Sequence, residues 1–583
     1  MASRSNNSNR NRREPQTIEG PTTVADSNRP FAVIAVFLLI ALVFLVRLIY
    51  LQVIVADEYS ADAESQRTVG FTVDPHRGTI YDRNGNILAI SVDATTIYAN
   101  PSEIDDPMSI GGAIASVLGG KAVDYAEAIQ SGGSTFAFIA RKADNEKAAQ
   151  LEALNLPGIY FIADTRREYP YGECAGQIVG ACSLAVDEET NSEYYTGISG
   201  LELYYDEDLS GTPGYYEAEV GADGMPIPGG VHESVAAVDG QDIVISIDIE
   251  MQQTLETALK DGLDKMGVES GSAILMDGGT GEIYAAASVP YFNPADRSEI
   301  KEGSTQLKCI SNLLEPGSIF KTVTALSALE TNTMTPDDTL ECPSVITADG
   351  YEISDAHERG DVVYSLREIM QYSSNVGISL TAEKMGFDVL YNHILTYKLH
   401  ELSGVDYPGE QLGYMVDFSE WSRVVGYNVS FGQGISLTPI QLVRFYGALV
   451  NDGVECTPHF LLRYAQTGET PTYETVDVVE NKSAIEPMVS MLQTVVESGT
   501  GTQAAIDGYD IAGKTSTAEI YDEVNGGYLD DQYNLGFTGF VANSNSQLVC
   551  YVGADKVIGD GVVTPIFNDI MSAAIERYNI ASK

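Results

Sequence analysis

The chain has 583 residues, which is too long for one ordinary domain and predicts two or three. Hydrophobic residues make up 44% of it, enough for real cores, and no run of like charges is long enough for a disordered acidic tail. The formal net charge of −50, from 83 acidic and 33 basic residues, repels phosphate groups and argues against a DNA or RNA partner.

The first predicted element is a membrane-spanning segment over residues 31–56. Its first sixteen residues, 31–46, are uninterruptedly apolar, and the pattern resumes after Arg47, whose long side chain can reach the lipid headgroups. A cleaved secretory signal is the alternative. The stretch is longer than the apolar core of such signals, about 7–15 residues, and Ile54 is bulky for a cleavage site. We therefore expect an uncleaved signal anchor and, since no second stretch is long enough, a single-pass protein.

The tail before this segment, residues 1–30, has more basic than acidic residues. Three acidic residues face five arginines, which are Arg4, Arg10, Arg12, Arg13 and Arg29. Such an excess marks the cytoplasmic side of a membrane. We expect the N-terminus in the cytoplasm and the residues after the segment outside it.

Residues 57–235 are of mixed α+β character. Asn84 and Gly85 stand between two apolar stretches and predict a β-hairpin, in which a type I′ turn needs positive φ at both residues. No residue of this region looks like a nucleophile with a partner, so we interpret it as a folded spacer domain. After a polar junction, residues 243–248 predict a strand, and residues 273–277 and 283–287 predict a second hairpin.

Cysteine and histidine patterns argue against a metal site. The six cysteines include no CxxC pair, which weakens a zinc or thioredoxin-like interpretation, and the six histidines include no HExxH. An even number of cysteines permits disulfides in an oxidising compartment, but we favour unpaired structural cysteines. They are Cys174, Cys182, Cys309, Cys342, Cys456 and Cys550.

The spacing Ser-x-x-Lys places a serine and a lysine one helical turn apart, where the lysine can act as the base for the serine. It occurs twice in this chain, and chance alone gives one or two copies. Ser298 and Lys301 lie among polar residues and before Gly303, so we interpret this copy as a surface turn. The other copy is Ser318 and Lys321.

Ser318 follows Pro316 and Gly317, which break the preceding element, and opens a predicted helix. On a helical wheel, one side can bury while Ser318 and Lys321 line a cleft. The side that buries carries Ile319, Val323 and Leu326. The N-terminus of a helix also favours negative charge on the serine oxygen. A Ser N-cap with a surface lysine is the alternative.

Two further elements support a site. Ser373 and Asn375 stand between two apolar helical stretches, so they would point into the space between helices. Residues 511–520 combine one lysine with small and hydroxyl side chains, which suits an edge strand that binds an anionic, extended substrate. The polar residues of this strand are Lys514, Thr515, Ser516 and Thr517. Taken singly, a helix-packing pair and an ordinary exposed strand explain these patterns as well.

In this order, the three elements resemble the SxxK, SxN and KTG motifs of the penicillin-recognising serine transferases. Other segments resemble the spacer and transpeptidase motifs of class B penicillin-binding proteins. They are residues 77–85, 200–202, 281–283, 373–377 and 432–439. The resemblance covers about residues 31–583. We see no glycosyltransferase domain between anchor and spacer, so the bifunctional class A type is not expected.

The resemblance implies a fold and a domain organisation. The fold is the α/β (α+β) penicillin-binding transpeptidase fold, an antiparallel sheet flanked by helices, with an N-terminal α+β spacer or pedestal domain and one transmembrane helix. The implied parts are a cytoplasmic tail (1–30), a signal anchor (31–56), a dimerisation-type spacer (57–235) and a transpeptidase domain (240–583). The implied activity is that of a peptidoglycan D,D-transpeptidase in cell-wall synthesis, which needs no metal or cofactor.

The resemblance also implies the chemistry. Ser318 would attack the penultimate D-Ala carbonyl of a stem pentapeptide while Lys321 accepts its proton. D-Ala leaves, and an amine of a neighbouring stem resolves the acyl-enzyme into a cross-link. The backbone N–H groups of Ser318 and Thr517 would form the oxyanion hole. β-Lactam antibiotics would acylate Ser318 as substrate mimics.

The remaining motif residues would bind and relay. Ser373 and Asn375 would transfer protons and hold the peptide amide. Lys514 and Thr515 would support the terminal carboxylate of the substrate, which Thr517 would also touch. Partners implied by the resemblance are a membrane glycan polymerase and proteins of division or elongation; the residues do not separate division, elongation and sporulation.

Ser516 departs from the family pattern, which usually has glycine at this third position. On the inner face of the strand its side chain would narrow the groove, whereas on the outer face it would be harmless. It puts β-lactam affinity in question more than the chemistry. Alternative functions are a catalytically weak penicillin-binding scaffold and a relative of the β-lactamases or D,D-carboxypeptidases; the anchor and long spacer argue against a β-lactamase.

Overall fold

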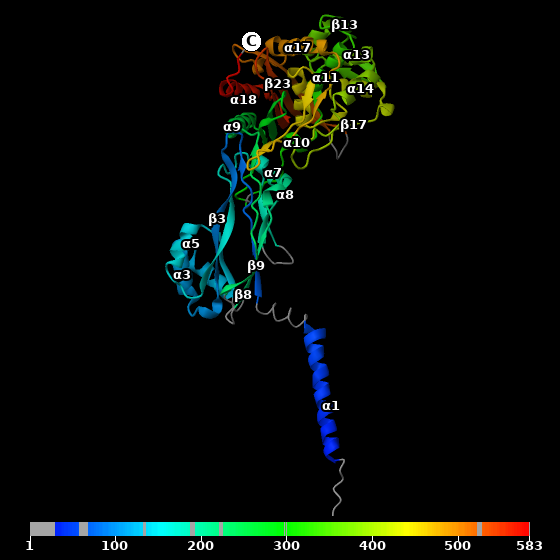
Figure 1. Ribbon diagram of the computed structural model, residues 1–583. Coiled ribbons are helices and arrows are strands. Elements are labelled where there is room, and N and C mark those ends of the chain that lie inside the picture. The colour runs from blue at the N-terminus through cyan, green and yellow to red at the C-terminus, as the bar shows by residue number, and fades with distance from the viewer. Residues whose placement is uncertain are drawn as a thin grey trace, which may run out of the picture. The chain divides into compact units, whose positions relative to one another are not determined.

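A computed structural model of the chain describes residues 29–56, 68–131, 136–186, 193–220, 226–296, 298, 300–521 and 527–581 (Figure 1). It forms two compact units. Unit 1 comprises residues 1–71 and 215–235, and unit 2 comprises residues 72–214 and 236–583. Of the predicted cytoplasmic tail, residues 1–28 lie outside the described residues.

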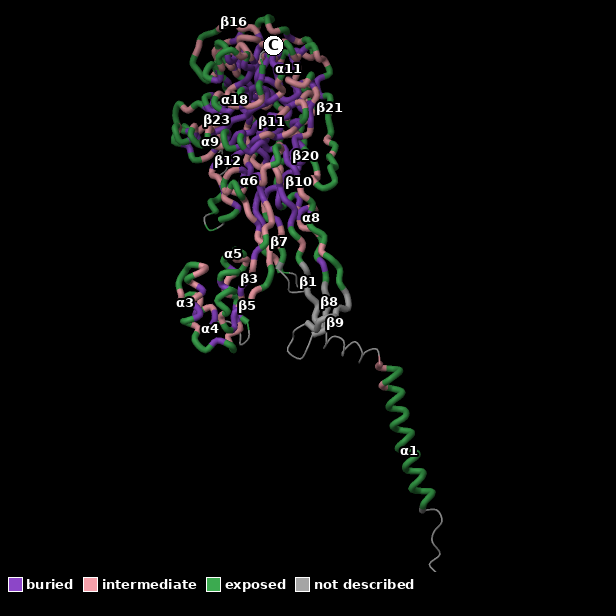
Figure 2. The backbone as a smooth tube through the Cα atoms, turned by 60° about the vertical axis from the view of Figure 1, so that its left-hand side comes forward, coloured by how far each residue is buried: buried purple, intermediate pink, exposed green. Residues whose placement is uncertain are grey.

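Unit 1 contains the predicted apolar segment. Helix α1 (Arg29–Ile49) continues as a π-helical turn, η1 (Tyr50–Ile54), and residues Pro30–Ile54 are long and apolar enough to cross a membrane. Residues 30–49 of α1 are all exposed (Figure 2). The predicted N-terminal apolar helix is therefore confirmed. A three-stranded sheet in the order β1–β8–β9 contains β1 (Thr68–Val73), β8 (Gly214–Val220) and β9 (Pro226–Val235).

In unit 2, a small α+β layer lies at one end of the long strand β3 (Ile87–Ala99). β3 pairs antiparallel with β4 (Ala137–Ala143) and β5 (Ile159–Glu168). Three helices share one core with these strands: α3 (Pro107–Leu118), α4 (Ala122–Ser131) and α5 (Asn145–Glu152). Asp106 starts α3 because its carboxylate accepts hydrogen bonds from two backbone N–H groups of the first turn, and Pro107 fits the first helical position.

The predicted hairpin at Asn84 and Gly85 is confirmed, since β2 (Ile80–Tyr81) pairs antiparallel with β3. The predicted type I′ turn is wrong, because Gly85 (φ 89°) has positive φ and Asn84 does not. The Asp82 carboxylate closes the loop instead: its Oδ1 accepts the N–H groups of Asn84 and Asn86, each at 2.8 Å. A side chain thus replaces the backbone geometry of the tighter turn.

Strand β10 (Ile243–Ile245) connects the early and late parts of unit 2. It pairs parallel with β2 and antiparallel with β20 (Leu461–Tyr464). It is shorter than the predicted strand over residues 243–248, because the Asp248 carboxylate already accepts the N–H groups of Glu250 and Met251 as the N-cap of α9 (Ile249–Met266).

The main sheet of unit 2 has five antiparallel strands in the order β12–β11–β24–β23–β22. They are β11 (Gly271–Asp277), β12 (Ile283–Val289), β22 (Asp510–Tyr521), β23 (Tyr528–Ala542) and β24 (Leu548–Ile558). β11 and β12 confirm the second predicted hairpin. β22 lies at the edge of the sheet and, within the described part of the chain, pairs only with β23, which confirms the predicted edge strand.

Helices cover both faces of this sheet (Figure 1). Along β11, Ala273 and Leu275 share a core with α9 and α18 (Thr564–Arg577), whereas Ile274 and Met276 belong to the other core. The helices of that second core include α11 (Lys321–Glu330), α13 (Asn375–Met385), α14 (Phe387–Thr396), α16 (Pro439–Val450) and α17 (Ile485–Ser498). An antiparallel sheet between two helical layers confirms the predicted fold class.

Shorter elements complete unit 2. The helical ones are η2 (Pro101–Glu103), α6 (Gly176–Val179), α7 (Gly200–Tyr204), α8 (Asp206–Ser210), α10 (Lys308–Ser311), η3 (Gly317–Phe320), α12 (Leu366–Gln371), η4 (Phe418–Glu420), α15 (Arg423–Ser430), η5 (Lys482–Ala484) and η6 (Thr502–Ala504). The strands are β6 (Cys182–Val186), β7 (Glu193–Gly197), β13 (Thr339–Cys342), β14 (Val345–Ala348), β15 (Tyr351–Ser354), β16 (Val362–Ser365), β17 (Tyr414–Met415), β18 (Ile435–Ser436), β19 (Val454–Cys456) and β21 (Thr475–Asp477). The six cysteines, all in the described part, are free, as predicted.

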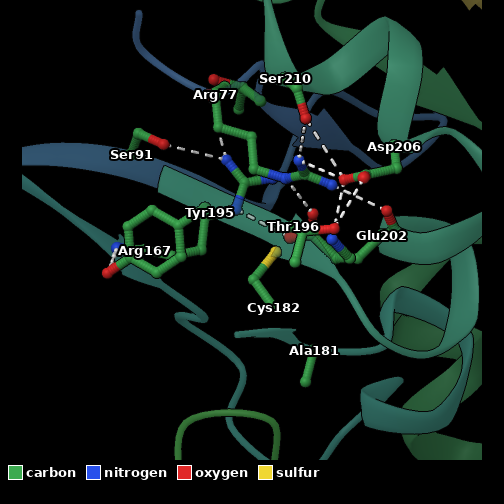
Figure 3. A network of polar contacts seen from close by, with 12 residues as sticks. Arg77, Ser91, Arg167, Ala181, Cys182, Tyr195, Thr196, Glu202, Asp206 and Ser210 are labelled. Carbon is green, nitrogen blue, oxygen red and sulfur yellow. Dashed lines mark hydrogen bonds and ion pairs between the residues drawn. The ribbon is translucent and has the colours of Figure 1, made fainter. Parts of the chain in front are cut away.

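A buried ionic cluster joins two of the motif segments (Figure 3). The Glu202 carboxylate on α7 accepts hydrogen bonds from Arg77 Nε at 2.6 Å and from Arg167 Nε at 2.8 Å. Burial alone would raise the pKa of Glu202, but the charges of Arg167 and Arg77 hold it below its ordinary value. Residues 77–85 and 200–202 therefore meet in space.

Candidate active site

Ser318 lies in the 3₁₀ turn η3, directly before helix α11. Gly317 has φ 52°, a left-handed conformation that residues with a Cβ atom rarely adopt, and its N–H donates to the carbonyl of Gly432 at 3.0 Å. A Cβ atom on Gly432 would lie 2.2 Å from the Gly317 oxygen, so this close approach of two backbones requires glycine. The sequence predicted that Ser318 opens the helix; in the structure Ser318 lies in a 3₁₀ turn, and the α-helix begins three residues later at Lys321.

Helix α11 is buried on every side from Lys321 to Leu329, unlike the predicted helix with one buried and one cleft-lining side. It lies at the centre of the second core, where its polar side chains find internal partners: the Thr324 hydroxyl donates to the Ser430 carbonyl at 2.8 Å. Lys321 is 0% exposed, so it does not line the cleft as predicted. Ser318 does.

Ser373 and Asn375 lie where α12 ends and α13 begins, between two helices as predicted. Ser373 adopts a left-handed conformation (φ 57°), and Ser374 caps α13 by accepting the N–H of Gly377 at 2.9 Å. Strained backbone of this kind persists where its surroundings hold it. It lets Ser373 and Asn375 both reach Lys321.

Lys514 lies on the edge strand β22 and is 0% exposed. Side chains alternate along the strand: Lys514 and Ser516 are buried, whereas Thr515 is half-buried and Thr517 is exposed. The Thr515 hydroxyl hydrogen bonds with that of Thr500 at 2.7 Å. Thr515, Ser516 and Thr517 all line the groove described below.

The Ser373 hydroxyl is the centre of the site. It donates to Ser318 Oγ at 2.9 Å and accepts from Lys321 Nζ at 3.1 Å and Lys514 Nζ at 3.0 Å. Lys321 Nζ also donates to the Ser373 carbonyl at 2.5 Å and to Asn375 Oδ1 at 2.7 Å. Among the described residues, no hydrogen bond joins Lys321 directly to Ser318. The structure thus brings together all five residues predicted to be catalytic.

Burial changes the charge of both lysines. Desolvation, and then the charge of Lys514, holds the pKa of Lys321 well below its ordinary value, against the charge of Asp355. Desolvation also lowers the pKa of Lys514 to about 7. A lysine that loses its proton near neutral pH can act as a base.

An open groove of about 760 Å³ runs along the site. Its walls come from the segment 355–359, from the turn after α12, from residues 498–500 at the end of α17, and from β22. Ser318, Ser373 and Asn375 all line it. The groove therefore exposes the serine oxygen while both lysines stay behind it.

Asp355 is a site residue that sequence reasoning missed. Its carboxylate accepts the hydroxyl of Ser374 at 2.9 Å and the N–H of Val376 at 2.9 Å, and it pairs with Arg359 Nε at 2.6 Å. These bonds hold the turn that carries Ser373. Asp355 has no motif around it and lies 34 residues after Lys321 in an unremarkable polar segment, so no sequence signal marks it.

The Ser-x-x-Lys copy at Ser298 and Lys301 is the surface turn that the sequence predicted. Ser298 and Lys301 are exposed, and the Ser298 hydroxyl donates to the neighbouring Asp296 carboxylate at 2.7 Å. Ser298 has no lysine partner among the described hydrogen bonds. Context, not spacing, separates the two copies.

Family comparisons decide the class of the protein. Residues 271–572 match the penicillin binding protein transpeptidase domain, and residues 72–245 match the penicillin-binding protein dimerisation domain. The chain belongs to the class B penicillin-binding proteins. This membership confirms the resemblance that the motifs indicated.

Two curated relatives and one crystal structure each align with most of this chain. Peptidoglycan D,D-transpeptidase FtsI of Escherichia coli is 30% identical over 94% of this chain and 92% of its own length. Stage V sporulation protein D of Bacillus subtilis is 28% identical over 92% of this chain and 84% of its own. A crystal structure of penicillin binding protein 3 from Mycobacterium tuberculosis, complexed with aztreonam, is 26% identical, covers 87% of this chain and 97% of its own, and superposes with a TM-score of 0.66.

Proposed function

We propose that this class B penicillin-binding protein is a peptidoglycan D,D-transpeptidase that cross-links stem peptides through an acyl-enzyme on Ser318. The observation that carries this function is the Ser373 hydroxyl, bonded at once to the oxygen of Ser318 and to the Nζ atoms of two buried lysines beside an open groove. A nucleophile within hydrogen-bond reach of its base, next to a cleft, is what acyl transfer by serine requires.

In the acylation step, Ser318 Oγ attacks the carbonyl carbon of the penultimate D-Ala. The proton of Ser318 passes through the Ser373 hydroxyl to Lys321, which must be neutral to receive it. The peptide C–N bond then breaks, and Lys321 returns the proton to the departing D-Ala amine. When Lys321 is neutral, its Nζ accepts from Ser373 and Ser373 accepts from Ser318, so both hydrogen bonds run in the direction of the transfer; the distances of 2.9 Å and 3.1 Å are short enough for this relay.

Backbone N–H groups stabilise the negative charge that develops on the substrate oxygen. We assign this oxyanion hole to the N–H groups of Ser318 and Thr517, of which Ser318 lies at the turn that starts α11. Donors fixed before the reaction stabilise a transition state without reorganisation. Lys514, Thr515 and Thr517 bind the terminal carboxylate of the donor, and Asn375 holds its peptide amide.

In the second half of the reaction, an amine of a neighbouring stem peptide attacks the ester carbonyl. An amide cross-link forms, and Ser318 leaves with a proton returned through Ser373. β-Lactams enter the same groove and acylate Ser318 as substrate mimics, which agrees with the aztreonam complex named for the M. tuberculosis relative.

We also propose a topology for the chain. Residues 1–30 form a cytoplasmic tail and residues 31–56 the anchor, followed outside the cytoplasm by the spacer (57–235) and the transpeptidase domain (240–583). The arginine excess of the tail supports this orientation. Because a transpeptidase needs glycan strands, we expect a membrane glycan polymerase as partner, together with proteins of division or elongation.

Labelling with a fluorescent penicillin tests the function. Wild-type protein in detergent and Ser298→Ala should become labelled to the same extent, and Ser318→Ala should not, because it lacks the attacking oxygen. Ser298→Ala is the matched control, since it removes the serine of the other Ser-x-x-Lys copy. Labelling that survives in Ser318→Ala would show that another residue is the nucleophile.

A second assay separates cross-linking from related reactions. Wild-type protein should join donor and acceptor stem peptides, and the product should be an amide between them. A protein that becomes labelled but only releases D-Ala would instead be a D,D-carboxypeptidase. A protein that becomes labelled and turns over neither peptide would be a penicillin-binding scaffold.

A further inference from the structure

Ser516 occupies the position at which the family pattern has glycine, and the structure places it on the inner face of β22. It is 7% exposed, and its hydroxyl donates a 2.7 Å hydrogen bond to the carbonyl oxygen of Pro316. Of the two alternatives, the inner face is therefore the correct one. The hydroxyl is directed at the turn that carries Ser318 and is bonded there.

Gly317 leaves the space that this side chain fills. A Cβ atom on Gly317 would lie 2.5 Å from Ser516 Oγ, too close for any atom to remain there. Gly536 is the register partner of Ser516 on β23, and the two residues are in ordinary van der Waals contact. Ser516 is thus packed into a tight local space with a satisfied hydroxyl, which agrees with a specific role for its side chain.

The bond connects the two segments that carry the proposed oxyanion hole. Ser516 directly precedes Thr517, so its carbonyl shares a peptide unit with the Thr517 N–H. Pro316 lies two residues before Ser318, so its carbonyl is one peptide unit away from the Ser318 N–H. In the described part of the chain, no other hydrogen bond links β22 to residues 316–320.

Strand β22 needs such a connection because it is an edge strand, fixed by backbone hydrogen bonds to β23 on one side only. An oxyanion hole works when both donors lie about 2.7–3.1 Å from the developing charge. Displacement of one donor by about 0.5 Å already degrades a site of this kind. The separation of β22 from η3 therefore determines how well the two N–H donors fit the developing oxyanion.

We propose that Ser516 is a positioning residue, which fixes the separation of the Ser318 and Thr517 N–H groups by bonding β22 to the nucleophile turn. This role rests on the proposed acyl-transfer function of Ser318. Ser516 lines the groove, but its hydroxyl is bonded to the Pro316 carbonyl, so we assign it an action through the two segments and not on the reacting atoms. It accelerates acylation by holding the hole in its working geometry and leaves the initial binding of substrate unchanged.

Stopped-flow acylation of the full chain in detergent by a fluorescent penicillin tests this role. Ser516→Ala removes the hydroxyl and keeps the Cβ atom, whereas Ser516→Gly restores the residue usual in the family. In both variants the acylation rate constant should fall about tenfold. Removal of one oxyanion-hole donor lowers the rate about 100- to 1000-fold, and here a donor is displaced, not removed. The dissociation constant of the complex before acylation should stay within about twofold.

Ser246→Ala is the matched control. The Ser246 hydroxyl is also buried and donates to backbone carbonyls, to Ile283 at 2.7 Å and to His459 at 3.0 Å, but it lies outside the groove. The Ser246→Ala variant should lose thermal stability. Its acylation rate per active site should not change, when the number of active sites is counted by titration with excess label. If the Ser516 variants acylate as fast as wild type once the rate is expressed per active site, the positioning role would be overturned.

A boronic acid inhibitor gives a readout that stability does not affect, because its tetrahedral adduct with Ser318 occupies the oxyanion hole. Its affinity should fall by the same factor as the acylation rate constant in both Ser516 variants. Unchanged acylation and unchanged boronate affinity would refute the role of Ser516 while the function of Ser318 stands. Wild-type protein that forms no adduct at Ser318 would refute the proposed function, and the inference with it.

Discussion

Two buried lysines face one serine hydroxyl in the groove, and this arrangement limits how much charge the site can hold. Lys321 and Lys514 are each 0% exposed and each donate to Ser373. Because both charges would be desolvated and mutually repulsive, the site releases protons at lower pH than lysines in water. The base of the reaction is thereby available without a histidine.

The rate of acylation should therefore rise with pH through an apparent pKa well below that of an ordinary lysine. Lys321 acts as a base only when neutral, and the neutral fraction grows as pH rises. In Lys514→Met, loss of the neighbouring charge should move this limb to higher pH, and in Asp355→Asn, loss of the opposing carboxylate should move it to lower pH. The pH profile of the acylation rate constant measures both shifts.

These two substitutions serve as controls for each other because their expected shifts have opposite signs. Shifts of the same sign would mean that structural damage, not charge, moves the profile. Profiles that coincide with the wild-type one would mean that Lys321 is not the group that titrates.

The short helix α7, with five residues, carries the central carboxylate of the buried ionic cluster. Its Glu202 binds Arg77 from the segment before β2 and Arg167 from the end of β5 (Figure 3). Arg77 also pairs with Asp206 on α8 at 2.7 Å. Removal of one partner from a buried ionic cluster leaves the others uncompensated.

Glu202→Gln should lower the free energy of unfolding by about 3–5 kcal/mol, because two buried guanidinium groups lose their charged partner. The folded-state pKa of Glu202 lies below the ordinary value of 4.5, so its stabilisation is present above pH 4.5 and is lost as pH falls through the folded value. Urea unfolding followed by circular dichroism at neutral and acidic pH measures both effects.

Asp264→Asn is the comparison variant for this measurement. Asp264 pairs with Lys260 on α9, but the two side chains are 58% and 46% exposed. Solvent screens such a pair, so its loss should cost less than about 1 kcal/mol. Equal losses in the two variants would contradict the importance assigned to the buried cluster.

The sequence predicted elements whose signal is local. The two hairpins and the edge strand β22 follow from turn residues and apolar alternation, and Ser318, Ser373 and Lys514 follow from short spacings. The left-handed φ of Ser373, the support by Asp355 and the burial of Lys321 depend on segments that fold against one another from far apart in the chain. The same holds for β10, whose partners β2 and β20 lie more than 150 residues away on either side.

At the scale of the whole molecule, the apolar helix α1 is the segment suited to attach the chain to a membrane. Helix α1 exposes its apolar side chains, for example Phe31 at 70% and Phe37 at 68%. The apolar span of 25 residues extends about 37 Å at 1.5 Å per residue, more than the roughly 30 Å of a hydrocarbon core. The groove belongs entirely to unit 2, whereas this span belongs to unit 1.

Deletion of residues 1–56 should therefore release the protein from membranes without slowing acylation. We expect the full chain to stay in the membrane pellet after alkaline carbonate extraction and the truncated chain to stay in the supernatant. Their acylation rate constants should agree within about twofold, since no groove residue is removed. The same truncation of Ser318→Ala supplies the unlabelled control, and a truncated chain that still sediments with membranes would reveal a second attachment.

The open edge of β22 has a consequence for handling the protein as well as for its chemistry. An unpaired strand edge is a template for any extended chain, including a strand from another copy of the same protein. A groove without substrate is thus a starting point for self-association when the protein is concentrated in solution. A β-lactam that fills the groove should then act as a stabiliser against aggregation, in addition to blocking the reaction.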